Sequence, residues 1–103
     1  MEEVTNERSA KQLLNTKNKP TAVYANGDEV ATGIYQYAQG MQLSVPDDLA
    51  IIGQENQPVE VGLGLTTVDH RLVQVGEQAF NLVIQKSTDK VEIPYRIIER
   101  QST

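Results

Sequence analysis

Two short polar segments carry the side chains best suited to binding a small ligand. Asn26-Gly27-Asp28 follows the apolar segment 21–25, and Gln54-Glu55-Asn56 follows the apolar segment 49–52. Carboxylates accept hydrogen bonds, and amides both donate and accept them, so the two segments suit a hydroxylated small molecule. The missing side chain at Gly27 would also let a ligand approach the backbone. We therefore predict ligand contacts from Glu55, Asp28, Gly27 and Gln54.

Two of these residues also have ordinary structural interpretations. Asp28 stands directly before a predicted helix, where an aspartate commonly caps the helix N-terminus. Gly27 could serve only the geometry of the turn. Glu55 has no predicted helix to cap, so ligand contact is the main interpretation at that position.

The residue inventory gives no support for catalysis or for a bound metal. The chain has no cysteine, which excludes disulfides, cysteine-ligated zinc and thiol nucleophiles. His70 is the only histidine and has no second metal ligand nearby in the sequence, so we expect a structural role. The Gly62-Leu63-Gly64 segment lacks the strand–turn–helix setting of a dinucleotide site. We predict that the chain is not an enzyme and needs no cofactor.

Charge and hydropathy exclude two further classes of function for this segment. Nine basic residues stand against fourteen acidic ones, for a net charge of −5, whereas a DNA-reading surface needs clustered Lys and Arg. No apolar run approaches the roughly 20 residues of a membrane span. The start, Met1-Glu2-Glu3, is acidic and has no apolar signal region, so we expect a cytoplasmic protein with no membrane partner.

The apolar pattern predicts a β-α-β unit that would bring the two polar segments together. Residues 21–25 and 49–52 are expected to form strands, the second covered on both faces because it is apolar without alternation. Residues 29–39 show helical spacing between them. A right-handed crossover makes such strands parallel, and ligands bind beyond the carboxyl ends of parallel strands. The sequence therefore predicts a ligand site at one sheet edge.

The flanking segments are expected to complete an α/β domain. A first helix should run from about Thr5, its N-cap, to Asn15. The segment from Gln54 to Gly64 should be irregular because it contains proline and glycine. Residues 65–68 should be extended, a helix should run from about Asp69 or Arg71 to Gln85, and residues 91–99 should form a last strand interrupted by a proline.

Four motifs, in the same order and spacing, resemble those of the LacI/GalR family of transcriptional regulators. Pro20–Tyr24 followed by Gly27–Gly33 resembles the family's P-T-A-V-F…N-D-E-M-A-x-G segment. Val45–Gly53 is similar to V-P-x-D-h-x-h-h-G, where h is apolar. Leu65–Val68, followed by Val75-Gly76, resembles L-T-T-V…L-G. Arg96–Thr103 resembles the family's C-terminus, particularly in its catabolite-control branch.

The resemblance implies a fold and a function. The fold would be a fragment of a periplasmic-binding-protein-like (type I), Rossmann-like three-layer α/β architecture with a mostly parallel sheet flanked by helices. The function would be the effector-binding and dimerisation portion of a repressor that responds to a sugar, a sugar phosphate or a related small molecule. The alternative is a sugar-binding module of a transport system, which shares the fold.

The resemblance also implies how the chain is divided. Residues 1–64 and 91–103 would belong to the C-terminal subdomain of the effector-binding core. The helix in residues 69–86 would pack on an N-terminal subdomain absent from the chain and should expose apolar surface. Operator DNA would be bound only through an absent headpiece. A homodimer interface is expected at Thr32, Tyr35, Val59, Val61 and Leu63.

Several positions depart from the family pattern. Gly27 replaces an asparagine that contacts the effector in the family. Gln54-Glu55 replaces an aromatic residue followed by aspartate, so Glu55 keeps a carboxylate at that position but on a longer side chain. In the catabolite-control branch, a basic pair on the third helix binds the phosphoserine of a phosphocarrier protein. Asn81 and Gln85 stand at those positions, and neutral amides lack the charge that phosphate requires, so this corepressor is disfavoured.

Overall fold

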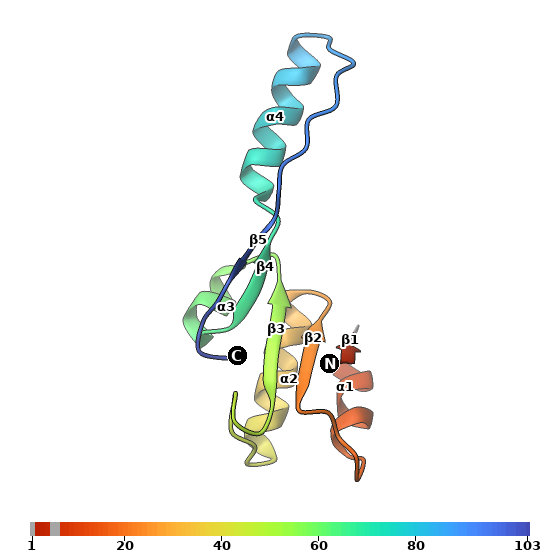
Figure 1. Cartoon of the computed structure of the whole chain (residues 1–103), viewed down its shortest axis with the longest axis vertical. Coiled ribbons are helices and arrows are strands. Elements are labelled where there is room, and N and C mark those ends of the chain that lie inside the picture. The colour runs from red at the N-terminus through yellow and green to blue at the C-terminus, as the bar shows by residue number, and fades with distance from the viewer. Residues whose placement is uncertain (1, 5–6) are drawn as a thin grey trace.

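A five-stranded sheet with the strand order β1-β2-β3-β4-β5 organises the chain (Figure 1). The computed structural model describes residues 2–4 and 7–103. The strands are β1 (Glu2–Val4), β2 (Ala22–Ala25), β3 (Ala50–Gln54), β4 (Thr66–Asp69) and β5 (Arg96–Ile98). The first four run parallel to one another, and β5 is antiparallel to β4. The expected mostly parallel α/β sheet is confirmed.

A helix lies between each strand and the next one along the chain. The helices are α1 (Glu7–Leu14), α2 (Asp28–Gly40), α3 (Pro58–Leu63) and α4 (Leu72–Ile84). The predicted β-α-β unit is present as β2, α2 and β3, with Tyr24 opposite Ile52 in a parallel register. Because both strands run in the same direction, their carboxyl ends lie at the same sheet edge, as the sequence predicts.

The core lies between one face of the sheet and the helices. Fully buried side chains include Val23 of β2, Ile51 of β3 and Ile34 of α2. Burial alternates along β3, where Ile51 is buried and Ile52 is half-buried. The prediction that residues 49–52 are covered on both faces is therefore wrong. A continuous apolar run shows that the side chains favour burial, but it does not show whether helices cover the second face of the sheet.

Helix α4 and the chain that returns from it form a projecting arm, seen at the top of Figure 1. No residue of α4 is buried, although the structure describes all of them. The radius of gyration is 16.6 Å, whereas about 13 Å is typical of a compact chain of this length. The expected apolar exposure is confirmed for Leu72, Val73, Val75, Phe80, Val83 and Ile84.

Three details of the sequence-based prediction are corrected. The segment 54–64 is not irregular throughout, because Pro58–Leu63 forms α3. Pairing in the last strand is limited to Arg96–Ile98, so residues 91–95 are not part of the sheet. Strand β1 was not expected. The proposed N-cap at Thr5 lies outside the described residues.

Candidate functional site

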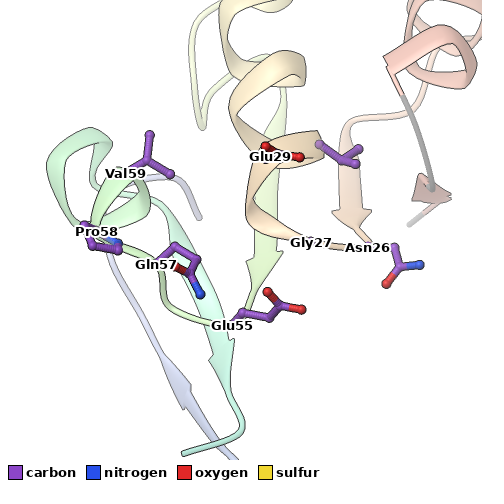
Figure 2. Close-up of a pocket in the computed structure, with 8 residues that line it drawn as sticks. Asn26, Gly27, Glu29, Glu55, Gln57, Pro58 and Val59 are labelled. Carbon is purple, nitrogen blue, oxygen red and sulfur yellow. The ribbon is translucent and has the colours of Figure 1, made fainter. Parts of the chain in front are cut away.

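The turn after β2 and the loop after β3 face each other across a cleft of about 610 Å³ at the carboxyl edge of the sheet. Figure 2 shows Glu55 and Gln57 on the β3 side of this cleft and Asn26 and Gly27 on the β2 side. The first turns of α2 and α3 complete its lining. We call it the first cleft, and it is lined by Asn26, Gly27, Glu29, Val30, Glu55, Gln57, Pro58 and Val59. The structure thus brings together two of the predicted ligand residues, Glu55 and Gly27.

A second cleft, of about 630 Å³, lies on the other side of the same loop and reaches the start of α4. Its lining residues are Glu55, Asn56, Gln57, Asp69, Arg71, Leu72, Val73, Gln74, Glu77 and Arg96. Glu55 and Gln57 line both clefts. Figure 2 shows the Glu55 carboxylate pointing toward the first cleft, where it can accept hydrogen bonds from a bound molecule.

The loop that carries Glu55 has an unusual backbone. Glu55 and Asn56 have φ angles of 91° and 55°, in a region that residues with side chains seldom adopt. Two hydrogen bonds fix this geometry: the Glu55 N–H donates to the Val68 carbonyl at 2.9 Å, and the Asn56 N–H donates to Thr67 Oγ1 at 3.2 Å. The result is a loop tied to β4 that leaves the Glu55 side chain exposed.

The turn after β2 depends on glycine. Gly27 has φ 114°, which a side chain would disfavour, and its N–H donates to the Ala25 carbonyl at 2.9 Å. Gly27 is also the residue that precedes the first turn of α2, and Asp28 is already helical. The interpretation of Asp28 as the N-cap is therefore wrong. The Asp28 side chain lies outside the part of the chain that the structure describes.

Gln54 ends β3, and its side chain contacts a residue that follows the neighbouring strand. Its Nε2 donates to His70 Nε2 at 2.7 Å, which ties the end of β3 to the residue after β4. Gln54 lines neither of the two clefts in the described structure. Its contact with His70 also agrees with the structural role expected for that histidine.

Sequence reasoning missed the contribution of β4 to this edge. Asp69 Oδ1 accepts the Arg71 N–H at 2.9 Å, and Asp69 Oδ2 accepts from Arg96 Nε at 3.0 Å. The backbone hydrogen bond from Arg71 and the nearby Arg96 guanidinium hold the pKa of the Asp69 carboxyl below its usual range, although burial opposes this. The signal was available, because Asp69 directly follows the segment 65–68 that was expected to be extended, just as the other two polar segments follow predicted strands.

The described residues contain neither a cluster of metal-ligating side chains nor a helix that could span a membrane. Residues 2–4 and 7–103 contain no group of three or more His, Cys, Asp or Glu side chains placed to hold a metal ion. In the same part of the chain, no helix is long and apolar enough to cross a membrane.

The family profile described as "Periplasmic binding protein-like domain" matches residues 1–103. The chain belongs to that family.

Among curated relatives of this periplasmic binding protein-like domain, an uncharacterized HTH-type transcriptional regulator from Bacillus subtilis is 34% identical over 90 residues. The match covers 84% of the chain and 28% of that protein. The HTH-type transcriptional repressor PurR of Klebsiella pneumoniae is 34% identical over 103 residues, covering 92% of the chain and 30% of the repressor. The chain thus spans about a third or less of the curated relatives it matches.

Solved structures give the same relationship. A LacI-family regulatory protein from Corynebacterium glutamicum superimposes with a TM-score of 0.83 at 30% identity, covering 93% of this chain and 40% of that one. A LacI-family regulator from Lactobacillus casei with bound sucrose gives a TM-score of 0.82 at 26% identity, covering 94% of this chain and 39% of that one. The predicted resemblance to LacI-type regulators and the predicted fold class are both confirmed.

The expected dimer residues of this periplasmic binding protein-like domain lie on α2 and α3 with unequal exposure. Val59 and Val61 of α3 are 42% and 57% exposed. Thr32, Tyr35 and Leu63 are half-buried, and the last two pack against the core. The two exposed valines are therefore the members of this set most available to a partner.

Proposed function

We propose that the chain is the effector-binding and dimerisation portion of a LacI-type transcriptional regulator, with its ligand held against Glu55. The observation that carries the proposal is the position of Glu55, which lies on a loop hydrogen-bonded to β4 and lines both clefts at the carboxyl edge of a parallel sheet. Such edges are where open α/β sheets bind ligands. The curated relatives from Bacillus subtilis and Klebsiella pneumoniae are named as transcriptional regulators, which supports regulation over catalysis.

The ligand that best fits this site is a neutral, polyhydroxylated molecule such as a sugar. Carboxylate oxygens at Glu55 and Glu29 accept hydrogen bonds from hydroxyl groups, while the Asn26 and Gln57 amides can also donate. None of the eight described residues that line the first cleft is Lys or Arg. The similar regulator from Lactobacillus casei has been solved with bound sucrose and, in a second structure, with bound glucose.

A sugar phosphate fits less well. The second cleft is lined by Arg71 and Arg96, but Arg96 is paired with Asp69, and Glu55 lines the same cleft. A phosphate placed beside Glu55 would meet like charge. A phosphocarrier corepressor is also disfavoured, since Asn81 and Gln85 are exposed neutral amides.

The alternative function, a sugar-binding module of a transport system, uses the same fold. The names of the matched relatives favour the regulator, and a regulator would act in the cytoplasm. In that case, ligand binding would shift the balance between two arrangements of the subdomains, and DNA would be bound by a separate headpiece.

The arrangement of the whole regulator follows from the same proposal. Residues 1–64 and 91–103 would form the C-terminal subdomain, while residues 69–86 would pack on the N-terminal subdomain. The exposed apolar face of α4 supports this division, because an apolar face of this kind ordinarily packs against another protein surface. Val59 and Val61 of α3, together with Thr32, Tyr35 and Leu63, would contribute to a homodimer.

A sugar titration with a matched pair of variants tests the proposed function. Sucrose and glucose are added to the chain, to Glu55→Ala and to Glu92→Ala, whose substitution removes an exposed carboxylate on the arm. In the unchanged chain and in Glu92→Ala, we expect sugar to shift the amide resonances near Glu55 and Gly27. In Glu55→Ala, sugar binding should be at least about tenfold weaker, because one or two hydrogen bonds to a charged group are lost. Equal affinity in all three would remove Glu55 from the site.

A further inference from the structure

We propose that Arg100 and Asn56 hold the loop after β3 in the shape that presents Glu55 to the two clefts. The proposal rests on the ligand-binding role proposed above for Glu55. Arg100 lines neither of those clefts, so its role would be that of a positioning residue.

The backbone of this loop needs support from elsewhere. Glu55 and Asn56 are consecutive residues with positive φ, and neither is glycine. Asparagine tolerates the left-handed region better than most residues, but glutamate gains no such advantage. Strained backbone of this kind persists only where surrounding contacts fix it, and it is often found at ligand sites.

Arg100 supplies a contact that reaches the Asn56 side chain. Its Nη2 donates to Asn56 Oδ1 at 2.6 Å, and its Nη1 donates to the Leu65 carbonyl at 2.8 Å. The planar guanidinium can make both bonds at once, because its donors are held in a rigid fork. The side chain of Arg100 thus joins the loop after β3 to the residue that precedes β4.

The segment that carries Arg100 is itself anchored to the sheet. The Arg100 N–H donates to Thr66 Oγ1 at 2.9 Å. Two residues later, the Ser102 N–H donates to the Gly64 carbonyl at 3.1 Å, and the Ser102 carbonyl accepts from the Ile51 N–H at 2.9 Å. Ser102 is buried, so these bonds are shielded from water. Arg100 is therefore a fixed support for the loop.

Two variants of Asn56 separate the side-chain contact from the backbone strain. Asn56→Gly keeps easy access to positive φ but removes the acceptor for Arg100. Asn56→Asp keeps the acceptor and adds a charge that suits the guanidinium. Arg100→Lys keeps the positive charge but loses the fork.

The test measures amide hydrogen exchange and sucrose affinity on the whole chain. In Asn56→Gly and Arg100→Lys, we expect exchange at the Glu55 amide to become about tenfold faster and sucrose binding about tenfold weaker, as for the loss of one charge-assisted hydrogen bond. Asn56→Asp should stay within about twofold of the unchanged chain in both measurements. Exchange at Val23 and Ile51, both in the core, should not change in any variant.

The outcomes distinguish this proposal from the proposed function. Unchanged exchange at Glu55 in both Asn56→Gly and Arg100→Lys would overturn the positioning role. Faster exchange at Glu55 in a chain that does not bind sucrose would support the positioning role and count against the ligand. If Arg100→Lys also loosens the core, the comparison of Asn56→Gly with Asn56→Asp decides, because both variants retain the other Arg100 contacts.

Discussion

Asp69 is the residue through which pH should act on this fold. One of its carboxylate oxygens accepts the Arg71 N–H and the other accepts from Arg96, and the first of these contacts contributes most to its lowered pKa. A lowered pKa means that folding favours the ionised carboxylate. The stability from Asp69 is therefore fully present above pH about 4, the ordinary value for aspartate, and is lost as the pH falls through the lower folded pKa.

We predict that Asp69→Asn lowers the free energy of unfolding by about 1 kcal/mol at neutral pH. The figure reflects the partly buried hydrogen bonds, because the Arg96 side chain is 56% exposed and its ion pair is screened by water. Urea denaturation at several pH values measures the effect, and the difference between the two proteins should shrink below pH about 4. Asp47→Asn, at an exposed site, is the control. A difference that grows in acid would contradict the assignment.

One local rule predicted where two of the candidate residues lie. Glu55 and Gly27 were expected at the same sheet edge because polar residues follow two neighbouring strands, and the structure brings them to one cleft. Their contact with a ligand stays a prediction. The contact of Gln54 with His70 was not predicted, because it depends on the neighbouring strand, and ligand contact by Gln54 stays a prediction. The support of the loop by Arg100 was also missed, because its partner Asn56 is 44 positions away in the sequence.

At the scale of elements, α3 depends on how it ends. Its C-cap residue is Gly64, with φ 70°, and a Cβ added there would lie 3.3 Å from Gln101 Oε1. We predict that Gly64→Ala lowers the free energy of unfolding by about 1 kcal/mol, because alanine is disfavoured in the left-handed conformation.

Gly40 provides a control of opposite sign. It is the last residue of α2, and nothing lies within 4 Å of an added Cβ. Gly40→Ala should raise the free energy of unfolding by roughly 0.5 kcal/mol, since alanine restricts the unfolded chain. Thermal melts of both variants followed by circular dichroism test the pair. Equal shifts in the same direction would show that the left-handed conformation of Gly64 is not needed.

The sequence predicted the longer helices and strands but not α3, which ends at Gly64. The long helices α2 and α4 and the strands β2 and β3 follow from apolar periodicity and were expected near their observed bounds. Helix α3 was missed because Pro58 and Gly64 were interpreted only as breakers. Proline at the first helical turn and glycine just after the last are also helix boundary signals, and six residues are too few to show a period.

At the scale of the whole molecule, the arm formed by α4 exposes many large apolar side chains. Phe80 and Val83 are 65% and 75% exposed and lie on a helix that contributes nothing to the core. The chain should therefore associate with itself at high concentration, because contiguous exposed apolar surface favours contact. Sedimentation velocity measures this directly.

We predict that the double variant Phe80→Glu and Val83→Lys shifts the chain toward the monomer without lowering its free energy of unfolding. Both side chains are exposed, so the folded monomer loses little packing. Asn81→Lys, which adds charge to the same helix but keeps its apolar residues, should leave association within about twofold. A chain that sediments as a monomer at every concentration and unfolds cooperatively would show that the arm needs no partner.

If Glu55 binds the ligand, a bound sugar must lie beside it, and the position of the sugar on the chain can be measured. Magnetisation transfer between sucrose protons and protein side chains, recorded by nuclear magnetic resonance, reports contacts within a few ångströms. We expect transfer to the side chains of Glu55 and Gln57, two residues that line both clefts. Transfer only to the exposed face of α4 around Phe80 and Val83, or no transfer at all, would contradict the proposed role of Glu55.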